Sequence, residues 1–135
     1  MKTLLLLPLL VTLSFATFTP QWKSCGDVSD SWLPTSVTFE KEPQVDQTNT
    51  IHVCGRVQEE IMTSRYIADF KAASQTFEFK STRNLTPQII FPGEDFCFDH
   101  TIILPFFAKG ASTVSFNLED FYWENVGCVI LDLLL

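Results

Sequence analysis

Short runs in which apolar and polar residues alternate recur along most of this chain, and no segment keeps a helical period over several turns. Alternation of this kind places every second side chain on the same face of a β-strand. In TIHVCGRVQ, for example, Ile51, Val53 and Val57 share one face. The runs of this type span residues 36–40, 50–58, 64–71, 75–81, 96–107, 113–121 and 128–135. Prolines and glycines separate them, so the sequence predicts an all-β domain, an antiparallel β-sandwich.

One segment, EEIMTSRYIADF at residues 59–70, permits a second interpretation. On a helix, Ile61, Arg65 and Ala68 would lie roughly on one face. The segment is rich in β-branched and aromatic residues and is flanked by strand-like runs. A strand is therefore the favoured prediction.

The first sixteen residues, MKTLLLLPLLVTLSFA, have the layout of a secretory signal peptide. Lys2 precedes a leucine-rich run, and small residues stand at Ser14 and Ala16. The apolar run is too short to favour a membrane-spanning anchor. We therefore expect cleavage after Ala16, one mature domain at residues 17–135, and delivery outside the cell or to the endolysosomal lumen.

Four cysteines remain after that cleavage: Cys25, Cys54, Cys97 and Cys128. In an oxidising compartment, an even number of cysteines predicts disulfides, here two bonds with three alternative pairings. None of the spacings is a CxxC pair, so the pattern does not favour a zinc site.

The charge balance and one sequence motif describe the expected surface. Acidic residues outnumber basic ones by sixteen to nine, which gives a formal net charge of −7. A chain of this charge repels phosphate backbones, so a nucleic-acid partner is not expected. Asn84-Leu85-Thr86 is an N-glycosylation acceptor in a predicted surface turn, so Asn84 is a predicted glycan site. We expect a soluble monomer.

Groups able to perform catalysis are few. His52 and His100 are the only histidines, and the cysteines are expected to be oxidised, so a cysteine–histidine nucleophile is not expected. No GxSxG motif is present. Asp99 and His100 stand together in sequence, but in an extended chain they point apart and would not hold one metal ion. We predict no enzyme activity, no metal and no cofactor.

Phenylalanine is unusually frequent, with thirteen residues against two tyrosines. In the segment FPGEDFCFDHTIILPFF, phenylalanines occupy both faces of one predicted strand, at Phe91, Phe96, Phe98, Phe106 and Phe107. Only one face of a sandwich strand points inward. The rings therefore either fill a solid core and cover its edges, or frame an apolar cavity that opens here. Composition alone leaves both alternatives open.

Three segments together resemble a known family. They are WKSCGDVSDSWLPTSVTFEKEP, GEDFCFDHTIILPF and VSFNLEDFYWENVGCVILDLLL. Their order and spacing resemble those of the ML lipid-recognition domains, which include the Niemann–Pick type C sterol carrier, the ganglioside activator and the mite group-two allergens. The resemblance covers essentially all of residues 17–135. It implies an immunoglobulin-like sandwich whose two sheets part to admit a sterol or a lipid tail, in a carrier without catalytic activity.

The resemblance also implies a pairing of the cysteines. Cys25 would pair with Cys128, joining the first strand to the last, which leaves Cys54 with Cys97. In the alternation of TIHVCGRVQ, Cys54 falls on the face opposite Ile51, so the second bond would join adjacent strands on an outer face. The chain departs from the sterol carriers, which have three disulfides and a short disulfide-closed loop that is absent here.

Of these properties, the identity of the ligand is the one that the sequence indicates least directly. The residues expected to line a lipid cavity are Phe70, Phe77, Phe79, Phe91, Phe96, Phe98 and Phe116, and for each the alternative is plain core packing. The expected ligand is a sterol or the acyl chains of a phospholipid or glycolipid, with a lumenal membrane or a receptor as a further partner. The competing hypothesis is a secreted immunoglobulin-like module with a solid core that recognises proteins or acts in innate recognition.

Overall fold

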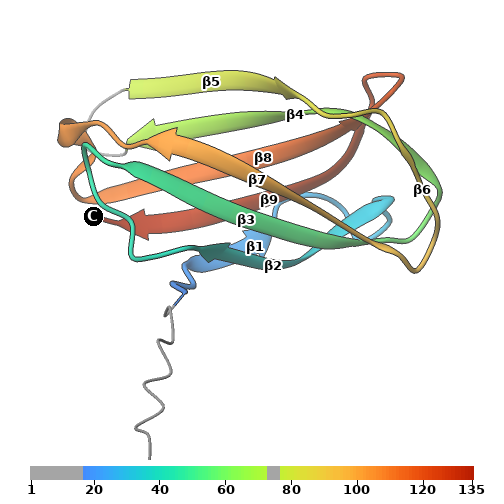
Figure 1. The fold of residues 1–135 in the computed structure, drawn as a ribbon, viewed down its shortest axis with the longest axis horizontal. Coiled ribbons are helices and arrows are strands. Elements are labelled where there is room, and N and C mark those ends of the chain that lie inside the picture. The colour runs from blue at the N-terminus through green and yellow to red at the C-terminus, as the bar shows by residue number, and fades with distance from the viewer. Residues whose placement is uncertain (1–16, 73–76) are drawn as a thin grey trace, which may run out of the picture.

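The computed structural model describes residues 17–72 and 77–135. The expected signal peptide and the first two residues of the predicted 75–81 strand lie outside the described residues. The elements in chain order are β1 (Gln21–Ser24), β2 (Trp32–Phe39), β3 (Thr48–Val57), β4 (Ile61–Ala72), β5 (Phe77–Asn84), β6 (Ile89–Ile90), β7 (Asp95–Ile103), the short 3-10 helix η1 (Phe106–Ala108), β8 (Ala111–Asp120) and β9 (Asn125–Leu134) (Figure 1). No helix among these elements has the length and apolar character needed to cross a bilayer.

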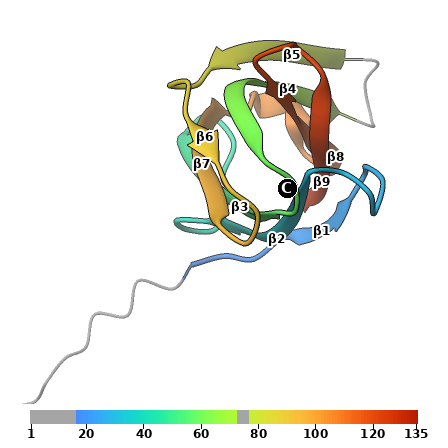
Figure 2. The same cartoon turned by 90° about the vertical axis from the view of Figure 1, so that its right-hand side faces the viewer.

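The strands form two antiparallel sheets that face one another. One sheet has the order β1-β9-β8-β4-β5, with β6 pairing to the start of β4, and the other has the order β2-β3-β7. Viewed from the end, the two sheets form the two layers of a sandwich (Figure 2). The predicted all-β sandwich is confirmed, and residues 59–70 contribute to a strand as favoured above.

The core follows the alternation of the sequence. Ile51, Val53 and Val57 of β3 all point inward and are buried, as predicted. The largest fully buried side chains are Trp32, Phe39, Phe116, Ile51, Leu104, Leu118, Leu131, Val37, Val53, Val57, Val114 and Val129. They come from both sheets, so burial of the inward faces holds the two layers together.

The strands differ from the sequence prediction in several places, among them that β2 begins at Trp32 and that β6 was not predicted. The strand expected to span residues 96–107 ends at Ile103, so that prediction is wrong beyond this point. Pro105 has no backbone N–H to donate to a neighbouring strand, and the chain turns there into η1. The alternating runs did not predict β1 (Gln21–Ser24), although the ML resemblance implied a first strand joined to the last near Cys25, and β1 pairs with residues 129–132 of β9.

One side of the sandwich is closed around Trp32. No room exists for a Cβ atom between the Trp32 indole and Gly55 of β3, or between Trp32 and Gly127 of β9. The indole Nε1 donates a hydrogen bond to the carbonyl oxygen of Phe96 at 3.2 Å. The two glycines therefore let both sheets approach the same ring closely.

Both disulfides are present. Cys25 bonds to Cys128, with 5.0 Å between the Cα atoms, and connects the end of β1 to β9. Cys54 bonds to Cys97, its direct partner across β3 and β7. Ile51 and Val53 point inward on β3, so Cys54 lies on the outer face of that sheet.

Candidate ligand cavity

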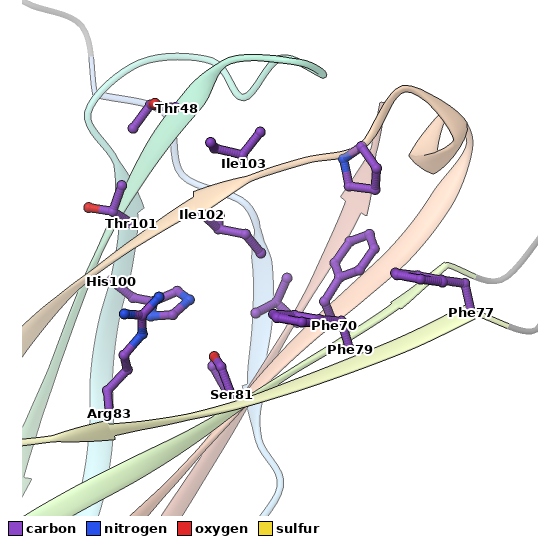
Figure 3. Close-up of a pocket in the computed structure, with 13 residues that line it drawn as sticks. Thr48, Phe70, Phe77, Phe79, Ser81, Arg83, His100, Thr101, Ile102 and Ile103 are labelled. Carbon is purple, nitrogen blue, oxygen red and sulfur yellow. The ribbon is translucent and has the colours of Figure 1, made fainter.

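A hollow of about 620 Å³ lies between β5 and β7, the edge strands of the two sheets (Figure 3). It is mostly apolar. The residues that line it are Thr48, Ala68, Phe70, Phe77, Phe79, Ser81, Arg83, His100, Thr101, Ile102, Ile103, Pro105 and Val114. The hollow is therefore a gap at one side of the sandwich, where the two sheets diverge.

Strand β5 lines the hollow through its period of two. Phe77, Phe79, Ser81 and Arg83 alternate along it and all face the gap. Phe79 pairs across the sheet with Phe70 of β4, which is buried at the base of the hollow. The rings of Phe77 and Phe79 remain 38% and 57% exposed. The first half of the inward face of β5, at Phe77 and Phe79, is thus apolar and remains partly exposed to water.

Strand β7 changes surroundings along its length. Its inward residues are Phe96, Phe98, His100 and Ile102. The first two are buried in the core, and Phe98 stacks on Tyr66 with ring centroids 4.3 Å apart. The last two line the hollow. The inward face of β7 therefore packs in the core at its first half and lines the hollow at its second half.

Polar groups gather at one end of the hollow. The Tyr66 hydroxyl and His100 Nδ1 are 2.9 Å apart and share a hydrogen bond. Figure 3 shows Arg83 extending from β5 towards His100, while Phe70, Phe77 and Phe79 lie at the other end. Burial, with a further contribution from the Arg83 charge, lowers the pKa of His100 to about 4. The imidazole is therefore neutral at pH 7.

Comparison with known proteins identifies the architecture. No protein-family model and no curated protein sequence matches the chain. A Niemann-Pick type C2 protein from Japanese carpenter ant superimposes with a TM-score of 0.55 at 7% identity, over 83% of this chain and 96% of that one. This chain has the fold of a Niemann–Pick type C2 protein. Chicken MD-1 complexed with lipid IVa aligns with a TM-score of 0.49 at 14% identity, over 87% of this chain and 96% of that one.

The shared architecture confirms the fold that the ML-domain resemblance implied, an immunoglobulin-like sandwich of two antiparallel sheets. At 7% identity the likeness to the Niemann–Pick type C2 protein establishes the fold alone. The chemistry of the cavity therefore has to come from the side chains of this chain.

The phenylalanines predicted to line a cavity occupy three different environments. Phe70, Phe77 and Phe79 line the hollow. The remaining four do not: Phe96, Phe98 and Phe116 are buried in the core, and Phe91 is 54% exposed outside the hollow. Phe98 and Phe116 pack edge to face with centroids 5.7 Å apart, which accounts for their burial.

Several lining residues were not predicted, and Arg83 is the most informative of them. The alternation that places Phe77 and Phe79 on one face of β5 continues through Ser81 to Arg83. Extending the predicted strand by two residues would have placed Arg83 beside the cavity. His100 was considered only for catalysis and metal binding.

A second, smaller hollow of about 300 Å³ adjoins the first and shares Arg83, His100 and Thr101 with it. Asn84, the predicted glycan site, also lines this second hollow and is exposed at the end of β5. A glycan on Asn84 would therefore stand beside the polar end of the cavity. No group of three His, Cys, Asp or Glu side chains in the described residues is arranged to hold a metal ion.

Proposed function

We propose that this protein is a non-enzymatic lipid carrier that holds a sterol, or an acyl chain of a phospholipid or glycolipid, between β5 and β7. One observation carries the proposal. A mostly apolar hollow of about 620 Å³ opens at the edge of a sandwich whose other side is closed. The fold shared with a Niemann–Pick type C2 protein supports it.

The physical basis is the burial of apolar surface. The volume falls within the range of roughly 300 to 1,000 Å³ that is typical of small-molecule sites. Phe77 and Phe79 leave ring surface in contact with water, and a bound lipid tail would cover it. Each Å² of apolar surface removed from water contributes about 25 cal/mol.

We further propose that the protein works outside the cytosol, as a secreted or endolysosomal protein. Disulfides persist in oxidising compartments, and two are present here. The signal-peptide pattern of residues 1–16 supports the same location. Amino-terminal sequencing of protein secreted from a eukaryotic host tests this point, with Thr17 expected as the first residue.

Organic extraction of the purified mature protein, followed by mass spectrometry, tests lipid carriage directly. We expect co-purified lipid in stoichiometric amount. After delipidation, a fluorescent sterol or a fluorescent fatty acid should bind saturably. Absence of both co-purified lipid and saturable binding of any lipid class would contradict the proposal.

A pair of variants on β5 locates the lipid. Ser81 faces the hollow, and its neighbour Thr82 is exposed and faces away. Ser81→Trp should fill the hollow and weaken lipid binding at least tenfold, whereas Thr82→Trp should bind as the unmodified protein does. Equal affinities in the two variants would place the lipid elsewhere.

A second function, recognition of a protein partner, is favoured by one observation. Phe121, Tyr122 and Trp123 are exposed at the turn between β8 and β9, and Tyr122 and Trp123 are 83% and 67% exposed. This turn lies at the end of the sandwich away from the C-terminus (Figure 1). The Asp120 carboxylate accepts hydrogen bonds from the backbone N–H groups of Tyr122 and Glu124, so the aromatic side chains are held on a defined turn.

Binding of a hydrophobic dye separates the two functions. If the apolar site of the native protein is the cavity, Ser81→Trp should abolish dye binding. If it is the aromatic turn, the double variant Tyr122→Ser, Trp123→Ser should abolish it instead. The carrier proposal predicts the first result.

A further inference from the structure

Arg83 has surroundings unlike those of the other arginines of the chain, Arg56 and Arg65. Arg65 Nη2 lies 3.0 Å from a carboxylate oxygen of Glu119. Arg56 Nε lies 3.6 Å from a carboxylate oxygen of Asp95. In the described part of the chain, no carboxylate lies within 4.0 Å of the Arg83 guanidinium.

Arg83 also marks the boundary between the apolar and polar parts of the cavity. It lines both hollows, whereas Phe70, Phe77 and Phe79 line the larger one alone. Among the described residues that line the larger hollow, Arg83 is the one with a permanent charge, and none is a carboxylate. A guanidinium is always protonated and offers a planar fork of N–H donors that matches carboxylate and phosphate oxygens.

In one of its two neutral tautomers, His100 supplies a second donor beside Arg83. When the Tyr66 hydroxyl donates to His100 Nδ1, the neutral imidazole carries its proton on Nε2. His100 lines both hollows, so its ring stands at the same end of the cavity as Arg83. Asp99, which lines the smaller hollow, points to the outer face of its sheet and is bonded to His52. The Asp99 carboxylate therefore does not form an ion pair with the Arg83 guanidinium.

We infer that Arg83, assisted by His100, binds the anionic head group of a single-chain lipid, a carboxylate or a phosphate, while the chain lies on Phe70, Phe77 and Phe79. The inference rests on the proposed carrier function and adds the class of ligand. A sterol would leave the guanidinium without an anionic partner, whereas a fatty acid or a lysophospholipid would pair with it.

The overall charge of the protein does not attract an anionic lipid, so the attraction would have to come from groups close to the bound head group. With a net charge of −7, the protein repels anions at long range. A preference for an anionic lipid would therefore have to come from groups inside the cavity. Arg83 is exposed at the cavity mouth, so added salt should weaken an ion pair formed there.

Isothermal titration with matched lipids tests the inference. Oleate is compared with oleyl alcohol, and lysophosphatidate with monooleoylglycerol, each below its micellar concentration at pH 7.4. We expect the protein to bind the anionic member of at least one pair about tenfold more tightly than the neutral member. Arg83→Gln should reduce that preference to about twofold or less and leave the affinity for the neutral lipid unchanged.

Arg56→Gln is the matched control, because it removes the same charge from an exposed site on the outer face of the other sheet. It should keep the tenfold preference. The inference is overturned if neither pair shows a preference, if Arg56→Gln and Arg83→Gln act alike, or if Arg83→Gln weakens both members of a pair equally. In those cases the carrier function stands as long as neutral lipids bind. If no lipid binds at all, both proposals fail.

Discussion

The two long sides of the sandwich are built from the same pair of sheets but differ in packing, because the sheets are in close contact on one side and diverge on the other. On one side, Trp32 is fully buried, and Gly55 and Gly127 from the two sheets leave no room for a Cβ atom beside it. On the other side, β5 and β7 enclose a hollow of about 620 Å³. Phe79 on this open side remains 57% exposed, whereas Trp32 is fully buried.

Under the carrier proposal, stability and ligand binding depend on different sides of the sandwich. The closed side contains a large ring, two glycines that permit close approach and the nearby bond between Cys25 and Cys128. The open side contains the exposed rings of Phe77 and Phe79, together with Arg83, which has no carboxylate within 4.0 Å among the described residues. We expect stability to depend mainly on the closed side and ligand binding mainly on the open side.

The largest loss of stability should follow removal of the bond between Cys25 and Cys128. The bond joins residues 103 positions apart, and its loss through Cys25→Ser with Cys128→Ser should cost about 5 kcal/mol in the chain-entropy model. Loss of the bond between Cys54 and Cys97, with a separation of 43, should cost about 4 kcal/mol. Urea unfolding measures both. A cost below about 2 kcal/mol for the first pair would contradict this account.

Trp32→Ala should have the next largest effect. The substitution removes a fully buried ring that fills the space between the sheets, and we expect a loss of about 4 kcal/mol in the free energy of unfolding. The control is Trp123→Ala, since Trp123 is 67% exposed and its ring lies 4.5 Å from the Arg65 guanidinium. Its loss should cost about 1 kcal/mol or less. Similar costs for the two tryptophans would remove the distinction between buried closure and exposed surface.

His100 should make stability depend on pH. Its pKa is lowered to about 4 in the folded protein, against 6.5 when unfolded, so acid favours the unfolded chain. Stability is fully present above pH 6.5 and is lost progressively as the pH falls towards 4. Between pH 7 and pH 5, the loss from this group should be about 2 kcal/mol. Urea unfolding of the unmodified protein and of His100→Gln at both pH values isolates the contribution of His100. An equal change in the free energy of unfolding between pH 7 and pH 5 in the two proteins would contradict the prediction.

The smallest effect on stability is expected from Phe79→Ser on the open side. Phe79 is more than half exposed, so its removal should change the free energy of unfolding by less than about 1 kcal/mol. Lipid affinity should nevertheless fall, because the ring lines the hollow. Phe116→Ala, in the fully buried core, should show the opposite balance, with a loss of about 4 kcal/mol. A stability loss in Phe79→Ser as large as in Phe116→Ala would contradict the division between the two sides.

The sequence predicted the fold better than the site, for a physical reason. Alternation states which residues share a face, and it correctly grouped Ile51, Val53 and Val57. It does not state whether the opposite sheet touches that face. Phe98 and His100 therefore look equivalent in sequence, although the first lies in the core and the second lines the hollow.

Strand ends were the other source of error. Strand β7 ends at Ile103, two residues before Pro105, whereas Pro34 lies within the paired edge strand β2, so a proline in the sequence does not by itself set the limit of an edge strand. At β5, continuation of the alternation to Arg83 would have revealed the one permanent charge in the described lining of the larger hollow. The resemblance to the ML domains indicated the architecture, and the identity of the cavity residues depended on where individual strands end.

Methyl-resolved NMR during titration with a lipid shows which residues the bound lipid touches. A lipid bound in the hollow should cause large shifts for the methyl groups of Ala68, Ile102 and Val114, which line it. Val37 and Val126, which are buried but lie outside the lining, should shift little. Shifts confined to residues outside the hollow, or no shifts at saturating lipid, would contradict the proposal that a lipid enters between β5 and β7.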